Sequence, residues 1–139
     1  LLWSINHLRA NRMPRPIRIT VGDIELDAHL SETPSALALW DALPIERTVN
    51  TWGHEFYFDI GIRIENSPDA SDIVELGDIA YWSPGSALCI FFGRTPASQG
   101  QEIRAASPVT VLGSVIDIPT DKLRRVRTGT SIRIEAKDV

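Results

Sequence analysis

Apolar and polar residues alternate along two short runs near the start of the chain, 17–21 and 24–30. An alternation with a period of two is typical of β-strands that bury one face. The pair Gly22-Asp23 lies between the runs, and Gly-Asp favours a two-residue hairpin turn. The sequence therefore predicts that the chain begins its fold with a β-hairpin.

A helix is predicted directly after this hairpin. Thr33 has the side chain of an N-cap, and Pro34 suits the first helical position. The segment 35–43 is apolar on almost every side, and Pro44 ends it. A helix that is apolar all round is usually buried, so we expect it to cover one end of a sheet or barrel.

The rest of the chain reads mostly as strands. The longest alternation places Phe56, Phe58, Ile60, Ile62 and Ile64 on one face, and Gly61 marks a point where this strand could bend. Two other runs are apolar on both faces, which indicates strands that are covered on both sides. The expected strands are 45–51, 56–64, 79–82, 87–92, 109–118 and 132–134.

Two further segments complete this reading of the chain. Residues 73–76 fit either a short strand or a helical turn, and 121–126 fit a short helical turn. The segment 93–108 is predicted to be a polar loop of sixteen residues. About eight strands with one strong and one short helix indicate a mainly β fold, a closed eight-stranded antiparallel barrel capped by helices. We expect this barrel domain to cover 16–136, with 1–15 as an N-terminal arm or extension.

Composition narrows the function classes. The chain has 139 residues, a net charge of −4 and a pI near 5.3, so a nucleic-acid-binding face is not expected. Its apolar runs fall far short of the roughly 20 residues that span a bilayer, and no secretory signal is recognised, so we expect a cytoplasmic protein with no membrane partner. The single Cys89 excludes an internal disulfide and a cysteine-rich metal site, and we expect no metal or other cofactor.

Aromatic residues gather in the stretch 77–98, where two apolar runs are joined by Ser-Pro-Gly and followed by a polar loop. Apolar walls with a few polar groups define most small-ligand or peptide clefts. Phe91 and Phe92 must face opposite sides of their strand, so one of them leaves the interior. The competing interpretation is that these aromatic residues simply belong to the core. The predicted ligand-binding residues are Trp52, Glu55, Tyr57, Trp82, Phe91, Arg94 and Thr95.

Three segments carry a family resemblance: 34–44, the Trp52-Gly53 pair with 55–58, and above all 77–98. The last contains Gly-Asp-Ile-Ala-Tyr-Trp-Ser-Pro-Gly and Ala-Leu-Cys-Ile-Phe-Phe-Gly-Arg-Thr-Pro-Ala-Ser. In these the chain resembles the cyclophilin-like family of small prokaryotic proteins of unknown function. The resemblance implies an eight-stranded cyclophilin-type barrel over about 16–135, and it implies no particular activity.

Three functions are compatible with these residues. The preferred one is binding of a small molecule or an extended peptide, with Glu55 and Arg94 as polar anchors. The second is a weak or unconventional peptidyl-prolyl cis-trans isomerase acting on a proline-containing peptide. There Arg47 or Arg94 would donate to the proline nitrogen, although the cyclophilin pattern of Arg followed by Phe-Met-x-Gln is absent after Arg47. The third is an enzyme with Glu55 or Asp59 as general base.

No catalytic constellation is recognised around the histidines or Cys89, so catalytic residues are left unassigned. His54 is the best-placed histidine, but its neighbour Glu55 should point to the opposite face of the strand. A homodimer formed through an exposed strand edge or an apolar patch is also left open by the sequence.

Overall fold

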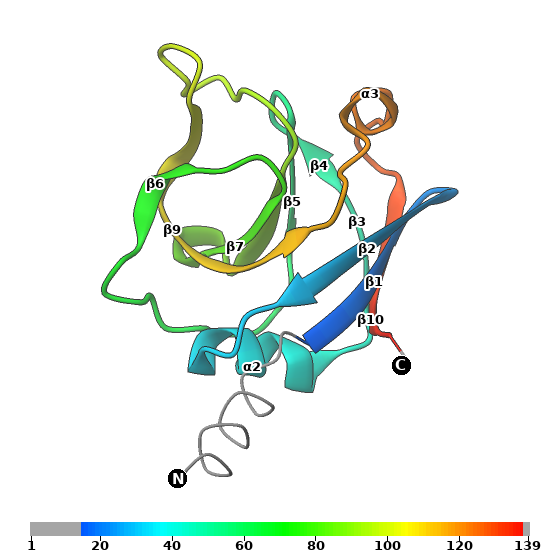
Figure 1. Ribbon diagram of the computed structural model, residues 1–139, viewed down its shortest axis with the longest axis vertical. Helices are drawn as coiled ribbons and strands as arrows, with labels where there is room; N and C mark the ends of the chain where they lie inside the picture. Colours follow the sequence, from blue (N-terminus) through cyan, green and yellow to red (C-terminus); the bar gives the residue numbers. More distant parts are fainter. Residues whose placement is uncertain (1–14, 138–139) are drawn as a thin grey trace, which may run out of the picture.

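An antiparallel sheet curls around the main core in the computed structural model, which describes residues 15–137 (Figure 1). The predicted arm therefore lies outside the described residues except for Arg15, the first residue of β1. The strands are β1 (Arg15–Val21), β2 (Ile24–Leu30), β3 (Ile45–Thr48), β4 (Asn50–Thr51), β5 (Glu55–Asp59), β6 (Ser71–Val74), β7 (Asp78–Trp82), β8 (Ala87–Phe91), β9 (Ile103–Val115) and β10 (Ser131–Ala136).

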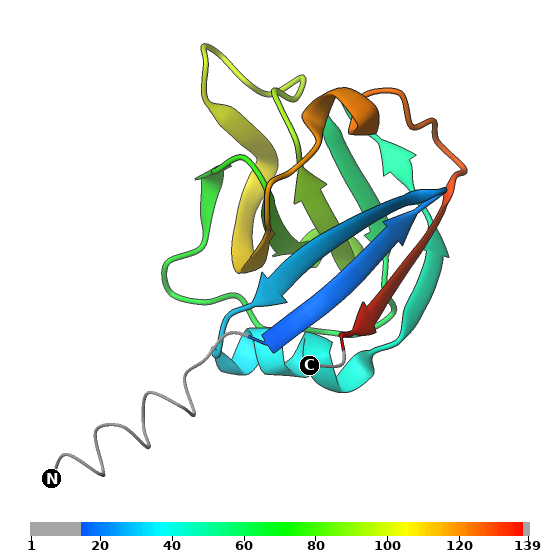
Figure 2. The ribbon, with the colours of Figure 1, turned by 45° about the vertical axis from the view of Figure 1, so that its right-hand side comes forward.

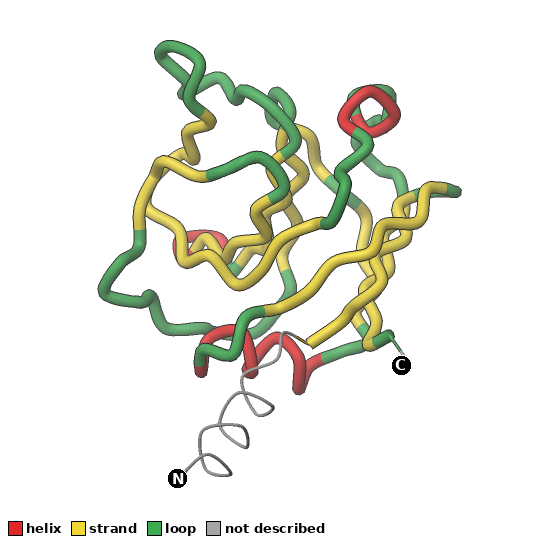
Figure 3. The backbone as a smooth tube through the Cα atoms, in the orientation of Figure 1, coloured by secondary structure: helices red, strands yellow, loops and turns green. Residues whose placement is uncertain are grey.

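The sheet is not closed by hydrogen bonds. Its order is β3-β10-β1-β2-β9-β7-β8-β5-β4, with β6 paired to β9 outside this path. The prediction of a closed eight-stranded barrel is therefore wrong in two respects: the described sheet has ten strands, and no ladder joins its two ends. Alternation along a strand indicates which face is buried, but it does not show which neighbours pair. The mainly β character of the prediction is confirmed, since strands make up most of the regular structure (Figure 3).

Arg47 bridges the open seam between β3 and the end of β5. Its Nε donates to the carbonyl of Asp59 at 3.0 Å, and its Nη2 donates to the carbonyl of Ile60 at 3.1 Å. β5 ends here because Gly61 has a φ of +71° and its N–H is accepted by the Asp59 carboxylate at 2.7 Å. The long strand predicted over 56–64 is therefore cut short at Asp59, although Ile60 and Ile64 remain buried.

The predicted hairpin and helix are both present. β1 and β2 pair around Gly22, and α2 (Pro34–Ala42) begins at Thr33, whose hydroxyl accepts from the Ala36 N–H. α2 lies across one end of the curled sheet (Figures 1 and 2). The expectation of a fully buried helix is wrong: only Ala36 and Leu39 are buried in α2, because its other face meets solvent and leaves Leu37 39% exposed.

The second short helix and the start of β9 also differ from the sequence reading. α3 (Thr120–Leu123) is shorter than the predicted turn, and a 3-10 helix, Ser83–Gly85, forms the Ser-Pro-Gly turn. β9 begins at Ile103 and includes Pro108, so the predicted long loop is shorter. Pro108 is tolerated because the β6–β9 register shifts between Ser71 and Ile73. Neither α2 nor α3 has the length and apolar character needed to cross a membrane.

The strands β7 and β8 carry two separate apolar clusters, one on each face. All five residues of β8 are buried, which confirms the prediction that these strands are covered on both sides. The inner face belongs to the main core, and the outer face is covered by residues of β6 and β9 (Figure 2). Phe92 lies in the main core and Phe91 in the outer cluster, so the two face opposite sides as the alternation predicted. The expectation that one of them leaves the interior is wrong, because both side chains are buried. The outer cluster consists of Val74, Ala80, Cys89, Phe91, Ala105 and Val109.

Loss of the Arg47 bridge should weaken the fold at the seam. Arg47→Met removes both donors to the carbonyls of Asp59 and Ile60, and we expect it to lower the free energy of unfolding by about 1 kcal/mol. Urea denaturation measures this change. Arg47→Lys keeps the charge but loses the forked geometry, so an intermediate loss is expected. An unchanged urea midpoint for Arg47→Met would show that the seam is held by other contacts.

Candidate functional site

A cavity of about 310 Å³ lies beside the outer apolar cluster, on the side of β5 and β8 that faces away from the main core. Four of its residues are aromatic or acidic, and the rest are small or aliphatic. The cavity is lined by Trp52, Glu55, Tyr57, Trp82, Cys89, Ala105, Ala106 and Val109.

Strand register explains why these residues meet. Tyr57 of β5 lies opposite Cys89 of β8, so Glu55, two residues before Tyr57, projects from the same face. Cys89 in turn lies opposite Ala80 of β7, and Trp82 continues that face. Buried Glu55 and Cys89 form part of the floor, whereas the half-buried aromatic side chains stand nearer the solvent. β9 supplies the facing wall.

Trp82 is held from two directions. Its indole Nε1 donates to the Ser107 hydroxyl on β9 at 2.7 Å. On the other side, a Cβ added at Gly85 would lie 2.9 Å from the indole ring, so the absence of a side chain there allows the close approach. The Ser83–Gly85 helix and β9 therefore fix the orientation of this ring in the cavity wall.

Trp52 is positioned by the turn between β4 and β5. The Trp52 N–H donates to the Glu55 carbonyl at 3.0 Å, and the next residue, Gly53, has a φ of +60°. A Cβ at Gly53 would lie 2.8 Å from Pro96, so the turn packs directly against the loop after β8. The loop also accepts a hydrogen bond through the Arg94 carbonyl from the His54 N–H at 2.9 Å.

Glu55 is the unusual group in this cavity. Its residue is only 5% exposed, and its Oε1 has no hydrogen-bond partner among the described residues. Burial raises the pKa of Glu55 from an ordinary value of 4.5 to about 7, although a hydrogen bond from the Cys89 thiol opposes this shift. The lining contains no basic side chain that would stabilise the carboxylate. Glu55 can therefore exchange a proton near neutral pH, and it has a free acceptor for a ligand.

Cys89 lies on the same face and responds to the same environment. Burial, and then the charge of Glu55, raise the pKa of the Cys89 thiol well above its ordinary value. A thiol is a poor nucleophile in that state. The structure thus agrees with the reading of Cys89 as a buried, unreactive side chain, but places it in the cavity wall.

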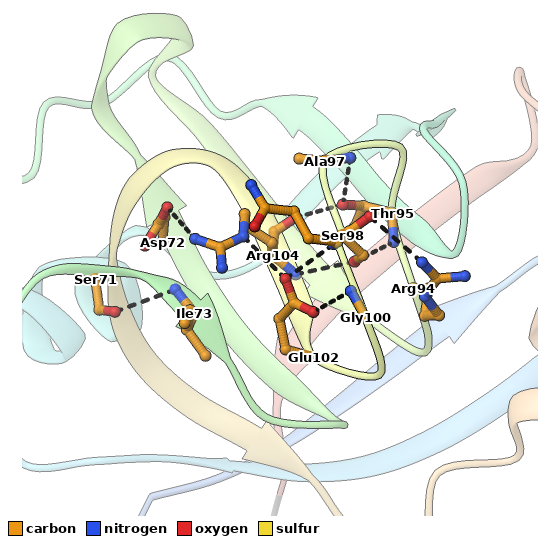
Figure 4. Close-up of polar contacts among 11 residues, drawn as sticks. Ser71, Asp72, Ile73, Arg94, Thr95, Ala97, Ser98, Gly100, Glu102 and Arg104 are labelled. Carbon is orange, nitrogen blue, oxygen red and sulfur yellow. Dashed lines mark hydrogen bonds and ion pairs between the residues drawn. The ribbon is translucent and has the colours of Figure 1, made fainter.

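Three of the seven predicted ligand-binding residues do not line this cavity. Phe91 is fully buried in the outer cluster. Arg94 is exposed, and its Nη2 donates to the Ser98 carbonyl at 3.3 Å. The Thr95 hydroxyl donates to the Arg104 carbonyl and accepts from the Ala97 N–H, which gives it a role in shaping the loop (Figure 4). The structure brings Trp52, Glu55, Tyr57 and Trp82 together, and their role in binding stays a prediction.

An ion-pair network fastens the same loop to β6 and β9. Arg104 donates to Asp72 at 2.9 Å and to Glu102 at 3.0 Å (Figure 4). Glu102 also accepts from the N–H groups of Gln99 and Gly100, and these hydrogen bonds lower its pKa to about 2. The network therefore maintains the cover over the outer face of the sheet.

Asp59 and His54, the other two residues considered for catalysis, do not line the cavity. Asp59 is exposed at the far end of β5, where its carboxylate accepts from Gly61. His54 stacks on Phe92 at a ring-centroid distance of 5.7 Å, and burial, followed by the charge of Arg124, lowers its pKa. Within residues 15–137, His, Cys, Asp and Glu side chains form no group of three that could hold a metal ion.

Four lining residues were missed by the sequence reasoning: Cys89, Ala105, Ala106 and Val109. The signal for Cys89 was its position opposite Tyr57, which becomes visible only when the register of β5 and β8 is known. The sequence places Ala105 and Ala106 of β9 in a predicted loop and Val109 at the predicted start of a strand. Two of them are alanines, whose small side chains leave space beneath the aromatic rings.

A larger open groove, of about 880 Å³, lies between the β1–β2 hairpin and the α3 region. Its charged lining residues have both signs, with Asp23, Glu25 and Asp27 facing Lys122 and Arg125 across it. These residues are all exposed, and the groove has no buried polar group comparable to Glu55. The smaller aromatic cavity is therefore the stronger candidate site.

Comparison with known proteins supports the fold that positions this cavity. A model of the family described as cyclophilin-like matches residues 15–135, and the chain belongs to that family. The solution structure of a hypothetical protein from Archaeoglobus fulgidus is 40% identical, with a TM-score of 0.75, and the match covers 89% of this chain and 95% of that one.

A more distant match is the structure of McbB in complex with tryptophan, at 20% identity and a TM-score of 0.62. It covers 88% of this chain and 45% of McbB, and at that identity it shows a shared fold alone. No curated protein matches the chain in sequence.

The raised pKa of Glu55 should make stability depend on pH. Between about pH 4.5 and 7, the folded protein holds a proton that the unfolded chain has released, so stability falls as pH rises through that window. The loss should approach about 3 kcal/mol at most above pH 7. Glu55→Gln should remove this component, which urea denaturation at pH 5 and pH 8 would reveal. The exposed Glu25→Gln is the control, and equal pH responses of wild type and Glu55→Gln would contradict the assignment.

Proposed function

We propose that this cyclophilin-like protein binds a small molecule in the cavity beside Glu55. The observation that carries the proposal is the free Oε1 of a buried carboxyl group in an otherwise aromatic and apolar cavity. A buried polar atom without a partner costs free energy, and a ligand donor would remove that cost. Such an arrangement is favourable at a binding site and unfavourable in a cavity that stays empty.

The shape of the cavity favours a compact ligand over an extended peptide. Ligand pockets commonly have volumes of roughly 300–1,000 Å³, and this cavity lies near the lower limit. Rigid aromatic walls offer large contact areas with little loss of side-chain freedom, and Trp82 is already held by Ser107. McbB is described with tryptophan bound, but the shared fold alone does not carry that ligand over to this chain.

The prolyl isomerase alternative gains no comparable support. Arg47 bridges the seam, and Arg94 lies exposed on the loop, so neither of the two arginines considered as donors lines the cavity. The apolar cavity itself would still suit a proline ring. That alternative therefore stays a prediction, and a direct X-Pro isomerisation assay tests it.

Removal of the Trp82 ring should weaken binding without unfolding the protein. Two single-ring probes, 2-phenylethanol and 2-phenylethylamine, are titrated while backbone and indole N–H signals are followed by NMR. We expect the probes to shift the NMR signals of cavity residues in the wild type. A probe that binds the wild type should bind Trp82→Ala about tenfold more weakly. Ser107→Ala, which loses the hydrogen bond to the ring, should cause a smaller loss.

The control is Trp40→Ala, because Trp40 is a half-buried tryptophan that lies outside the cavity and packs against the main core from α2. It should lower stability while probe binding remains unchanged. If neither probe shifts cavity signals at millimolar concentration, or if both tryptophan variants weaken binding equally, the proposed function is wrong.

A second candidate function is acid–base catalysis on the bound molecule. Glu55 favours it, because a general acid or base works best when its pKa lies near the working pH. Asp59, the other base considered from the sequence, lies outside the cavity. The same carboxyl group could thus bind a donor group on the ligand and exchange a proton with it.

Mass spectrometry of a mixed pool of small metabolites tests the catalytic candidate. The pool is incubated at pH 7 with wild type, with Glu55→Gln and with Glu25→Gln. We expect a product that accumulates with wild type and Glu25→Gln and falls at least about a hundredfold with Glu55→Gln. A product formed equally by all three proteins would exclude Glu55 as the acid–base group.

A further inference from the structure

The geometry points to an organic cation as the ligand of this cavity: we propose a compact apolar body that bears an ammonium or amidinium group directed at Glu55. This inference rests on the proposed binding function and specifies the chemistry of the ligand. It goes beyond that proposal, because an aromatic cavity alone would accept neutral molecules equally well.

The charges of the residues that line the cavity favour a cationic ligand. Glu55 contributes a carboxyl group, and the other lining residues bring no positive charge to it. The other titratable residues that line the cavity are Tyr57 and Cys89, and neither becomes cationic. A positive charge beside Oε1 therefore has to come from outside the lining.

The arginine closest in sequence to the lining residues of β9 already forms ion pairs. Arg104 precedes Ala105 and Ala106, but its guanidinium is paired with both Asp72 and Glu102. Reaching Glu55 would break two ion pairs and release the loop that the network holds (Figure 4). The Arg104 guanidinium is thus held by two carboxylates, and Oε1 of Glu55 has no hydrogen-bond partner among the described residues.

The aromatic walls favour the same class of ligand. The cavity lining includes Trp52, Tyr57 and Trp82. The faces of aromatic rings attract cations, and Trp is the most effective of them. Both contributions strengthen with burial, and Glu55 is only 5% exposed. An anionic ligand would meet the carboxylate and the ring faces with the wrong sign, and a neutral one would give the carboxylate, once it has ionised, no counter-charge.

The two single-ring probes form a matched test of this inference. 2-Phenylethylamine is a cation at pH 8, and 2-phenylethanol has a similar shape without the charge. For wild type at pH 8, we expect the amine to bind at least about tenfold more tightly than the alcohol. Glu55→Gln should bring the affinity for the amine down to that for the alcohol, while the affinity for the alcohol stays within about twofold.

Glu25→Gln is the matched control, because Glu25 is an exposed acid on β2 that lies outside the aromatic cavity. It should keep the full preference for the amine. If wild type binds the alcohol and the amine equally, the cation inference is overturned and the binding function stands. Equal loss of preference in Glu25→Gln would also overturn it, since the effect would then reflect net charge. If neither probe binds, the binding function itself fails.

Discussion

The structure depends on the need to cover both faces of β7 and β8. Every residue of β8 is buried, so an apolar layer must lie on each side of these strands. The curled sheet and α2 enclose the inner face, whereas β6 and the first part of β9 cover the outer face. The candidate site exists because the outer cover, which includes two alanines, leaves space above Glu55 and Cys89.

Glu55 illustrates how this second layer differs from an ordinary core. The inner face is packed with hydrophobic side chains, and the ring centroids of Phe56 and Phe92 lie 4.5 Å apart. The outer face instead buries a carboxyl group with a free oxygen and surrounds it with aromatic rings. Burial of a polar oxygen without a hydrogen-bond partner costs free energy, and no contact of Oε1 within the described residues offsets that cost. Glu55 therefore lowers the stability of the layer that it belongs to.

Local patterns predicted individual elements better than their arrangement. The β1–β2 hairpin, the Thr33 cap and the doubly covered strands followed from periodicity and turn chemistry, because those signals lie within a few residues. Local patterns did not predict the open seam, the exposed face of α2 or the early start of β9, since each of these depends on contacts between distant segments. The same distinction applies to the site: alternation placed Glu55 and Tyr57 on one face, but the loop contacts of Thr95 required the fold.

The seam beside Arg47 has a further consequence for contacts between copies of the chain. An open sheet has two edges, and unpaired edge strands invite pairing with strands of other molecules. Here the edge strands are very short, Ile45–Thr48 and Asn50–Thr51, and the first carries the exposed charges of Glu46 and Arg47. Each offers too few free backbone groups to guide an incoming strand. At its β3 and β4 ends, the open sheet therefore presents little template for an incoming strand.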